Sequence, residues 1–187
     1  MRQFGEGANL PLPEPSRRIA AHHRKIDIQV YHRDDGLWDV EGHLTDSRPV
    51  ALEFPDGIRP AGQPIHSMWL RLTVDSTGLI VAACADTEAS PYIGVCGSIV
   101  SSYEQLVGLR VGPGFRGHVR RLFTGIRGCT HLSELVGTMA TGVIQTLAGV
   151  GWDSKERKPM QLDGCHALQS SGPVVAQHYP KWYRKAS

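Results

Sequence analysis

The stretch HSMWLRLTVD, residues 66–75, decides the fold class of this chain. Every second residue in it is apolar, which is the period of a strand with one buried face: Met68, Leu70, Leu72 and Val74. The turn signal Ser76-Thr77-Gly78 follows, and an apolar return strand runs from Leu79 to about Asp86. The stretch therefore predicts a β-hairpin with one face against a core.

Upstream, the sequence predicts another hairpin, centred on the turn signal Asp34-Asp35-Gly36. Apolar residues alternate with polar ones before this turn, at Ile26, Ile28 and Val30. After the turn, residues alternate between the two faces of the next strand. One face carries Trp38, Val40, Gly42 and Leu44, and the other carries Asp39, Glu41, His43 and Thr45. A connection rich in proline and glycine, Pro49–Pro64, joins the hairpins. Two such hairpins favour an antiparallel sheet of four strands.

The second half of the chain changes to helical spacing. One helix is predicted over Gly97–Val107, and a short basic helix over Phe115–Phe123. The strongest helix, of roughly 18 residues, follows Gly128-Cys129-Thr130 and ends at Gly149 and Gly151. Its apolar face carries Leu132, Leu135, Val136, Met139, Val143 and Leu147. The predicted fold class is thus α+β, with an antiparallel sheet of two hairpins packed against about three helices.

Length and composition predict one domain over residues 1–187. Residues 1–16 hold three prolines and no apolar signal region, so a flexible N-terminal arm is expected there, and residues 152–187 read as an irregular C-terminal extension. The net charge of +2 is too small to predict a nucleic-acid partner, and Arg17-Arg18 and Arg120-Arg121 are interpreted as solvated surface. No apolar run approaches the roughly 18 residues of a membrane helix, so we expect a cytoplasmic protein with no membrane partner.

The cysteines Cys84, Cys96, Cys129 and Cys165 lie far apart, and none forms a C-x-x-C pair. A disulfide framework is not expected in a cytosolic domain of this size. Cys84 alternates among alanines in a predicted strand and is interpreted as a small core residue. Cys165 precedes His166 in a loop-like segment and is a candidate fourth or alternative metal ligand.

Three reactive groups fall at element boundaries, where side chains converge on a site. His66 opens a strand with the parity of Met68, Cys96 precedes the first long helix, and Cys129 begins the strongest helix, two residues before His131. Free N–H groups at a helix start favour a thiolate. Two sulfurs with one or two imidazoles suit a tetrahedral zinc site or an iron–sulfur cluster.

The remaining histidines are interpreted as surface residues: His22, His23, His32, His118 and His178. His43 shares a strand face with Asp39 and Glu41. That group suits either acid–base chemistry or a solvated sheet face, and the solvated face is the preferred interpretation.

Five segments closely resemble an uncharacterised bacterial family, a domain of unknown function: GLWDVEGHLTD (Gly36–Asp46), HSMWLRLTVD (His66–Asp75), GLRVGPGF (Gly108–Phe115), GCTHLSEL (Gly128–Leu135) and DGCHAL (Asp163–Leu168). The resemblance covers nearly the whole chain. It implies no particular activity.

The stretch Gly62–Leu147 is also similar to iron–sulfur cluster assembly scaffolds of the NifU/IscU type. That family has three cysteine-bearing segments, which here correspond to Gly62–Ser67, Val95–Ser102 and Gly128–Leu132. His66 stands in place of the first cysteine, and the family's metal-binding aspartate falls at Ser67 or Met68, which cannot replace it. The resemblance implies a scaffold-like fold with a centre at His66, Cys96 and Cys129. Imidazole in place of thiolate favours zinc, mononuclear iron or a mixed-ligand cluster.

The preferred hypothesis is a metal- or iron–sulfur-binding protein that holds or transfers its metal or cluster. Its ligands would be His66, Cys96 and Cys129, completed by His131 or Cys165, and its partner a metal or sulfur donor or acceptor protein. The rival hypothesis is an enzyme in which Cys129 is the nucleophile and His131 or His66 the base, acting on an acyl or thioester substrate. A third is a regulatory binding domain with structural cysteines.

Overall fold

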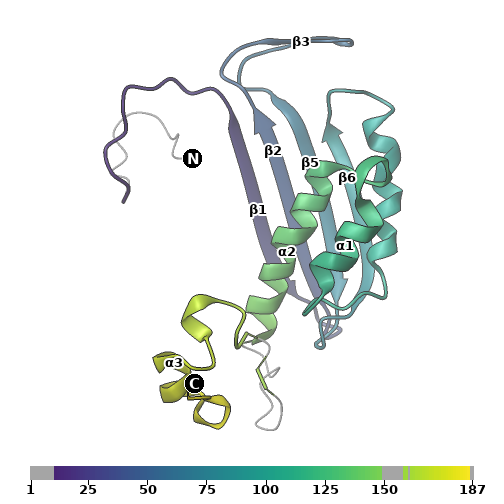
Figure 1. Cartoon of the computed structure of the whole chain (residues 1–187). Coiled ribbons are helices and arrows are strands. Elements are labelled where there is room, and N and C mark those ends of the chain that lie inside the picture. The colour runs from purple at the N-terminus through teal and green to yellow at the C-terminus, as the bar shows by residue number, and fades with distance from the viewer. Residues whose placement is uncertain (1–10, 149–157, 160, 186–187) are drawn as a thin grey trace.

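The computed structural model describes residues 11–148, 158–159 and 161–185. Its centre is a four-stranded antiparallel sheet in the order β1-β2-β5-β6 (Figure 1). The strands are β1 (His23–His32), β2 (Trp38–Ser47), β5 (Pro64–Val74) and β6 (Ile80–Ala89). The predicted α+β class and both predicted hairpins are therefore confirmed.

Both hairpin turns use glycine in the left-handed region. Gly36 has a φ of 81° and Gly78 a φ of 76°, values that L side chains adopt only with strain. Between the hairpins, β2 and β5 pair directly, so that Val40 lies opposite Leu72 and Leu44 opposite Met68. The apolar parity of both hairpins therefore falls on the same face of the sheet.

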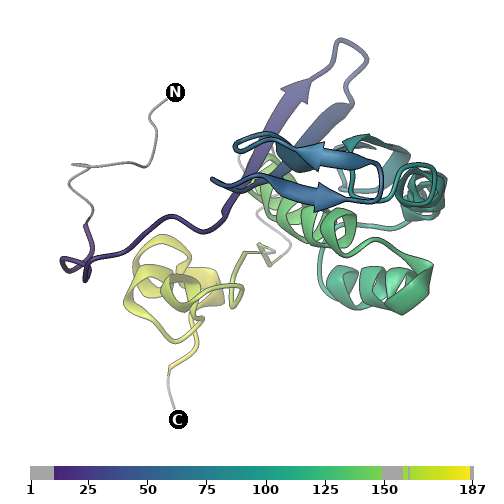
Figure 2. The same cartoon turned by 90° about the horizontal axis from the view of Figure 1, so that it is seen from above.

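The connection between the hairpins holds a small hairpin that the sequence did not predict. It consists of β3 (Leu52–Phe54) and β4 (Gly57–Arg59) and lies over one end of the four-stranded sheet (Figures 1 and 2). Strands of three residues are too short to show an alternating pattern, which is why only the proline and glycine content was visible.

Helices cover one face of the sheet, and the strongest predicted helix lies along it as α2 (Thr130–Ala148) (Figure 1). All six predicted apolar residues of α2 are buried: Leu132, Leu135, Val136, Met139, Val143 and Leu147. The predicted helix end at Gly149 and Gly151 lies outside the described residues. The packing is close at Gly42 of β2, where a Cβ atom would lie 2.7 Å from Met139 Sδ. Glycine in this strand lets α2 approach the sheet.

Two other helical segments complete this layer. The short basic helix is α1 (Phe115–Phe123), with the predicted bounds. The segment predicted over Gly97–Val107 forms the 3-10 helix η1 (Cys96–Leu106), which buries Tyr103 and Leu106. Val107, predicted on the buried face, is 46% exposed because the helix ends before it.

The structure corrects the prediction for Cys84. Cys84 is exposed, and its register partner is Arg71 on the face without helices, whereas Ala83 and Ala85 pack against the core. Because alanines flank Cys84 on both sides, the sequence does not indicate which face of this strand is buried. The prediction that Cys84 is a core residue is wrong.

Outside the sheet, residues 11–22 form neither helix nor strand. The described part of the C-terminal extension contains η3 (His166–Leu168), α3 (Pro173–His178) and η4 (Pro180–Trp182). The extension was predicted to be irregular, and its described part holds these short helical segments, in which Asp163 accepts hydrogen bonds from the Ser170 backbone N–H and hydroxyl at 2.7 and 2.6 Å. Among the described residues, no helix is both long and apolar enough to cross a membrane.

Candidate metal centre

Asp46 is a buried carboxylate at the end of β2. Alternate residues of β2 are buried from Val40 to Leu44, and Asp46 continues that series with 1% of its surface exposed. Its side chain therefore faces the helical layer instead of solvent. The register of β2 with β5 places it directly opposite His66.

His131, in the first turn of α2, completes a cluster with Asp46 and His66. The imidazole rings of His66 and His131 have centroids 3.8 Å apart and are tilted by 30°. Asp46 Oδ2 lies 3.3 Å from His66 Nδ1 and 3.4 Å from His131 Nε2. One ligand atom from each residue lies within 4.8 Å of the other two. We call this group the Asp–His–His cluster.

Burial favours the neutral form of both imidazoles of the cluster. Two effects lower the pKa of His66 to about 4: burial, which is the larger, and the positive charge of the neighbouring His131. The carboxylate of Asp46 acts in the opposite direction. Burial also lowers the pKa of His131. His66 Nδ1 is buried, and its contact with Asp46 Oδ2 at 3.3 Å does not have the geometry of a hydrogen bond. Neutral imidazole is the form of histidine that can coordinate a metal ion.

Arg24 and His22 hold the carboxylate of Asp46 in place. Arg24 donates from Nε to Oδ1 at 2.8 Å and from Nη2 to Oδ2 at 2.9 Å, and His22 Nε2 lies 2.9 Å from Oδ1. Burial alone would raise the pKa of Asp46, but these hydrogen bonds outweigh it and lower the pKa below its ordinary value. The carboxylate is therefore ionised at neutral pH.

A hollow of about 410 Å³ opens beside the cluster. Its lining combines the cluster with apolar and charged side chains from three places: Arg48 directly after β2, Leu52, Glu53 and Phe54 of β3, and Tyr92 in the loop after β6. A metal on the cluster would have three protein ligands, and the hollow offers space for a further ligand.

The structure brings together two of the five predicted metal ligands, His66 and His131. Cys129 lies next to them, with Sγ 3.8 Å from His131 Nδ1, and its backbone N–H donates to the Tyr103 hydroxyl at 3.0 Å. Cys96 is half-buried at the start of η1, and Cys165 is exposed in the C-terminal extension. None of these cysteines belongs to the group of ligand atoms within 4.8 Å. A ligand role for Cys96, Cys129 or Cys165 stays a prediction.

Sequence reasoning missed Asp46, Arg24 and the role of His22. A signal for Asp46 was present, because it occupies the position after Val40, Gly42 and Leu44 on the apolar face of its strand. His22 is exposed, as predicted, but its ring still reaches Asp46. The other histidines predicted at the surface are exposed: His23, His32, His118 and His178.

His43 lies on the face of the sheet without helices. Its ring stacks on Trp69 with centroids 3.8 Å apart, and its Nε2 lies 2.9 Å from Ser67 Oγ, which donates to Glu88 at 2.8 Å. Asp39 and Glu41 instead bind Thr73 and Arg71. His43 therefore forms no acid–base group with its strand neighbours, in agreement with the preferred interpretation.

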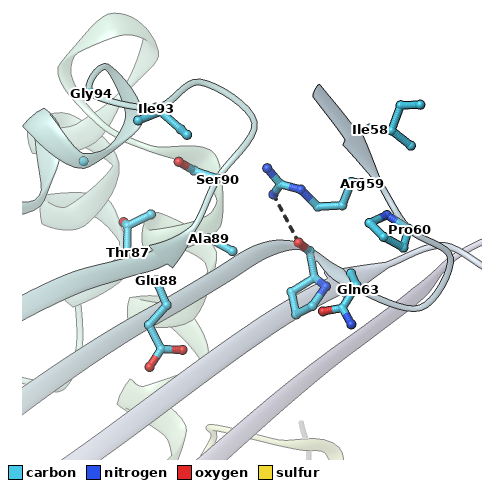
Figure 3. Close-up of a pocket in the computed structure, with 12 residues that line it drawn as sticks. Ile58, Arg59, Pro60, Gln63, Thr87, Glu88, Ala89, Ser90, Ile93 and Gly94 are labelled. Carbon is cyan, nitrogen blue, oxygen red and sulfur yellow. Dashed lines mark hydrogen bonds between the residues drawn. The ribbon is translucent and has the colours of Figure 1, made fainter. Parts of the chain in front are cut away.

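Another hollow, of about 650 Å³, lies between the β3–β4 hairpin and the end of β6 (Figure 3). Arg59 points across it and donates to the Pro64 carbonyl at 3.2 Å, the bond dashed in Figure 3, and also pairs with Asp56 at 3.3 Å. The protein itself thus engages this guanidinium, and no member of the Asp–His–His cluster lines the hollow.

Residues 22–145 match the model of a family described as "Protein of unknown function (DUF2889)". The matched segment runs from β1 into α2 and contains every residue of the Asp–His–His cluster. No curated protein and no solved structure matches the chain. These comparisons contain no match to an iron–sulfur cluster scaffold, so that resemblance stays a prediction.

Proposed function

The chain belongs to the DUF2889 family of unknown function, and from the geometry of its own residues we propose that it binds one divalent transition-metal ion through Asp46, His66 and His131. The observation that carries this proposal is the convergence of three ligand atoms within 4.8 Å from three separate elements, β2, β5 and α2. Zinc and iron(II) are the ions that two imidazoles and one carboxylate suit best.

The protonation states support metal binding. Both imidazoles have lowered pKa values, so a metal ion at neutral pH displaces no proton from them. A bond to a metal would also satisfy His66 Nδ1, which is buried and whose contact with Asp46 Oδ2 does not have the geometry of a hydrogen bond. The ionised carboxylate of Asp46 supplies the negative charge of the ligand set.

Arg24 is compatible with this role as a positioning residue. Each carboxylate oxygen has two acceptor positions, so Oδ2 can accept from Arg24 and still bind a metal. Such outer partners orient a ligating carboxylate in metal sites. Arg24 Nη1 also donates to Glu134 at 2.5 Å, which ties this guanidinium to α2.

Three protein ligands leave coordination positions open, which is typical of catalytic zinc sites and of the two-histidine, one-carboxylate iron(II) sites. The hollow beside the cluster supports an exchangeable ligand at such a position. We therefore favour a centre that handles a small molecule over a closed structural site. A role in metal transfer would instead require a donor or acceptor protein as partner.

Isothermal titration of the metal-free protein with zinc, and with iron(II) under anaerobic conditions, tests the proposal. Wild type should bind one ion per chain, and His66→Ala and His131→Ala should each weaken binding at least tenfold. His118→Ala is the matched control, because His118 is exposed and lies outside the cluster. Equal binding by all four proteins would refute the proposal.

A second function rests on the contact between Cys129 and His131. With Sγ 3.8 Å from Nδ1, His131 is placed to accept a proton from the thiol, as in thiol enzymes that act on acyl or thioester substrates. Alkylation with iodoacetamide over a range of pH tests it. A pH dependence of Cys129 modification that is unchanged by His131→Ala would exclude this pair.

A further inference from the structure

The chain has a strongly basic segment that the metal proposal does not use. Between Glu104 and Glu134 there is no acidic residue and no lysine, but there are five arginines: Arg110, Arg116, Arg120, Arg121 and Arg127. The whole chain has a net charge of only +2. Positive charge is therefore concentrated in one part of the molecule.

The fold places most of these arginines around α1 and the short helix η2 (Gly125–Arg127). Phe115, Val119 and Phe123 form the buried face of α1, so the arginines of this helix project from its other side. Two hollows adjoin α1, one of about 590 Å³ towards α2 and one of about 510 Å³ towards η2. They share Arg120 and Thr124 and are therefore adjacent, and we call the two hollows together the arginine groove.

The cations of this groove lack carboxylate partners. Within the described part of the chain, Arg120, Arg121 and Arg127 form no ion pair, unlike Arg24, Arg33, Arg59 and Arg71. Glu134 lines the groove, but it pairs with Arg24 at 2.5 Å. Among the described residues that line the groove, the arginines therefore outnumber the one carboxylate, Glu134, and leave a net positive charge there.

The other lining residues suit a ligand with a phosphate group and an apolar part. Thr124 and Thr130 offer hydroxyl groups to the larger hollow, whereas the hydroxyls of Ser133 and Thr138, which also line it, bond to Tyr103 and to the Glu134 carbonyl. Val119 and Phe123 give the hollow an apolar floor. Guanidinium groups bind phosphate in a bidentate manner, and hydroxyls add hydrogen bonds. Volumes of this size are typical of small-molecule sites.

We propose that the arginine groove binds an organic phosphate. Its phosphate group lies on Arg120, Arg121 and Arg127, and its organic part lies on Val119 and Phe123 in the larger hollow. This site is separate from the Asp–His–His cluster, since none of the cluster residues lines either hollow.

The chain supplies a matched pair of variants for the test. Arg120→Gln/Arg121→Gln removes two adjacent charges from the groove, and Arg17→Gln/Arg18→Gln removes two adjacent charges from the exposed segment before β1. Titration with ADP at fixed ionic strength should give one site, weakened at least tenfold by the first double substitution and unchanged by the second. The affinity for pyrophosphate should follow the same order among wild type and the two double variants.

Thermal melting without ligand checks that each variant is folded, and Arg127→Gln alone replaces the groove variant if that one does not fold. Equal ADP binding by wild type, groove variant and control would overturn the proposal. Absence of ADP and pyrophosphate binding would also overturn it. If only vesicles with 30% phosphatidylserine or duplex DNA bind, the groove recognises a polyanionic surface and the proposal is wrong.

Discussion

Asp46 and His66 are register partners across β2 and β5, and Asp46 Oδ2 lies 3.3 Å from His66 Nδ1. The pairing of the sheet thus fixes two of the three proposed metal ligands. The first turn of α2 supplies the third, and α2 is held against the sheet by the close contact at Gly42. The geometry of the cluster therefore depends on the sheet register and on the packing of α2.

The first prediction concerns the charge of Asp46. Asp46→Asn keeps the shape of the side chain but removes the charge that Arg24, His22 and a metal would share. We expect loss of metal binding and, in the metal-free protein, a decrease of about 2 kcal/mol in the free energy of unfolding. Urea denaturation and metal analysis measure both. Asp34→Asn, at an exposed turn residue, is the control, and matching values for the two variants would contradict the account.

The second prediction is a pH dependence of the metal-free protein. The pKa of His66 is about 4 in the folded state, against an ordinary value of 6.5, and its side chain is 16% exposed. The unfolded chain binds a proton more readily between these values, so acidification favours unfolding. Because His66 takes up its proton mainly in the unfolded chain, the free energy of unfolding should decrease by about 3 kcal/mol as the pH falls from 6.5 to 4.

Urea denaturation at several pH values, with wild type and His66→Gln, measures this effect. The stability of wild type should fall more steeply with acidification than that of the variant, because glutamine does not titrate. Parallel curves would show that His66 has no lowered pKa.

The third prediction separates the two roles considered for Cys129. Cys129→Ser should leave the metal content unchanged, because the thiol lies outside the proposed ligand set. His131→Ala should reduce metal binding and also alter the pH dependence with which Cys129 is alkylated, since the two side chains are in contact. Loss of metal on Cys129→Ser would instead make this thiol a ligand.

The fourth prediction tests the packing that positions α2. In Gly42→Ala the new Cβ would lie 2.7 Å from Met139 Sδ and 2.9 Å from Leu135 Cδ1, so these two side chains must move, and because both are buried we expect α2 to shift with them. We expect a loss of about 2 kcal/mol in stability together with weaker metal binding, because His131 moves with α2. Gly137→Ala is the control. It lies within α2 with no neighbouring atom inside 4 Å, and alanine there should stabilise the helix by about 1 kcal/mol.

The sequence was sufficient where structure follows from local periodicity. Both hairpins, α1 and the buried face of α2 depend on apolar residues at fixed spacing, and all of them were predicted. Spacing did not separate the 3-10 helix η1 from an α-helix, because both bring residues three apart to one side. Spacing also did not indicate whether Cys84 lies on the buried or the exposed face of its strand, because alanines flank it on both sides.

The candidate site was only half predictable, for a different reason. His66 and His131 stood out by residue type and position, whereas Asp46 joins them through the pairing of β2 with β5, a contact between residues distant in sequence. The cysteines at helix starts indicated sulfur ligands, because a helix start favours a thiolate. That effect is local, however, and does not indicate which other side chains lie near the sulfur atom. The polar residue on an apolar strand face was the informative signal for Asp46.

X-ray absorption at the metal edge of the zinc-loaded protein tests the central claim most directly. Coordination by Asp46, His66 and His131 predicts a first shell of only nitrogen and oxygen at about 2.0–2.1 Å, with the outer-shell scattering of two imidazoles. His66→Ala should remove one imidazole from that signal. A sulfur scatterer at about 2.3 Å would contradict the account and favour the cysteines as ligands.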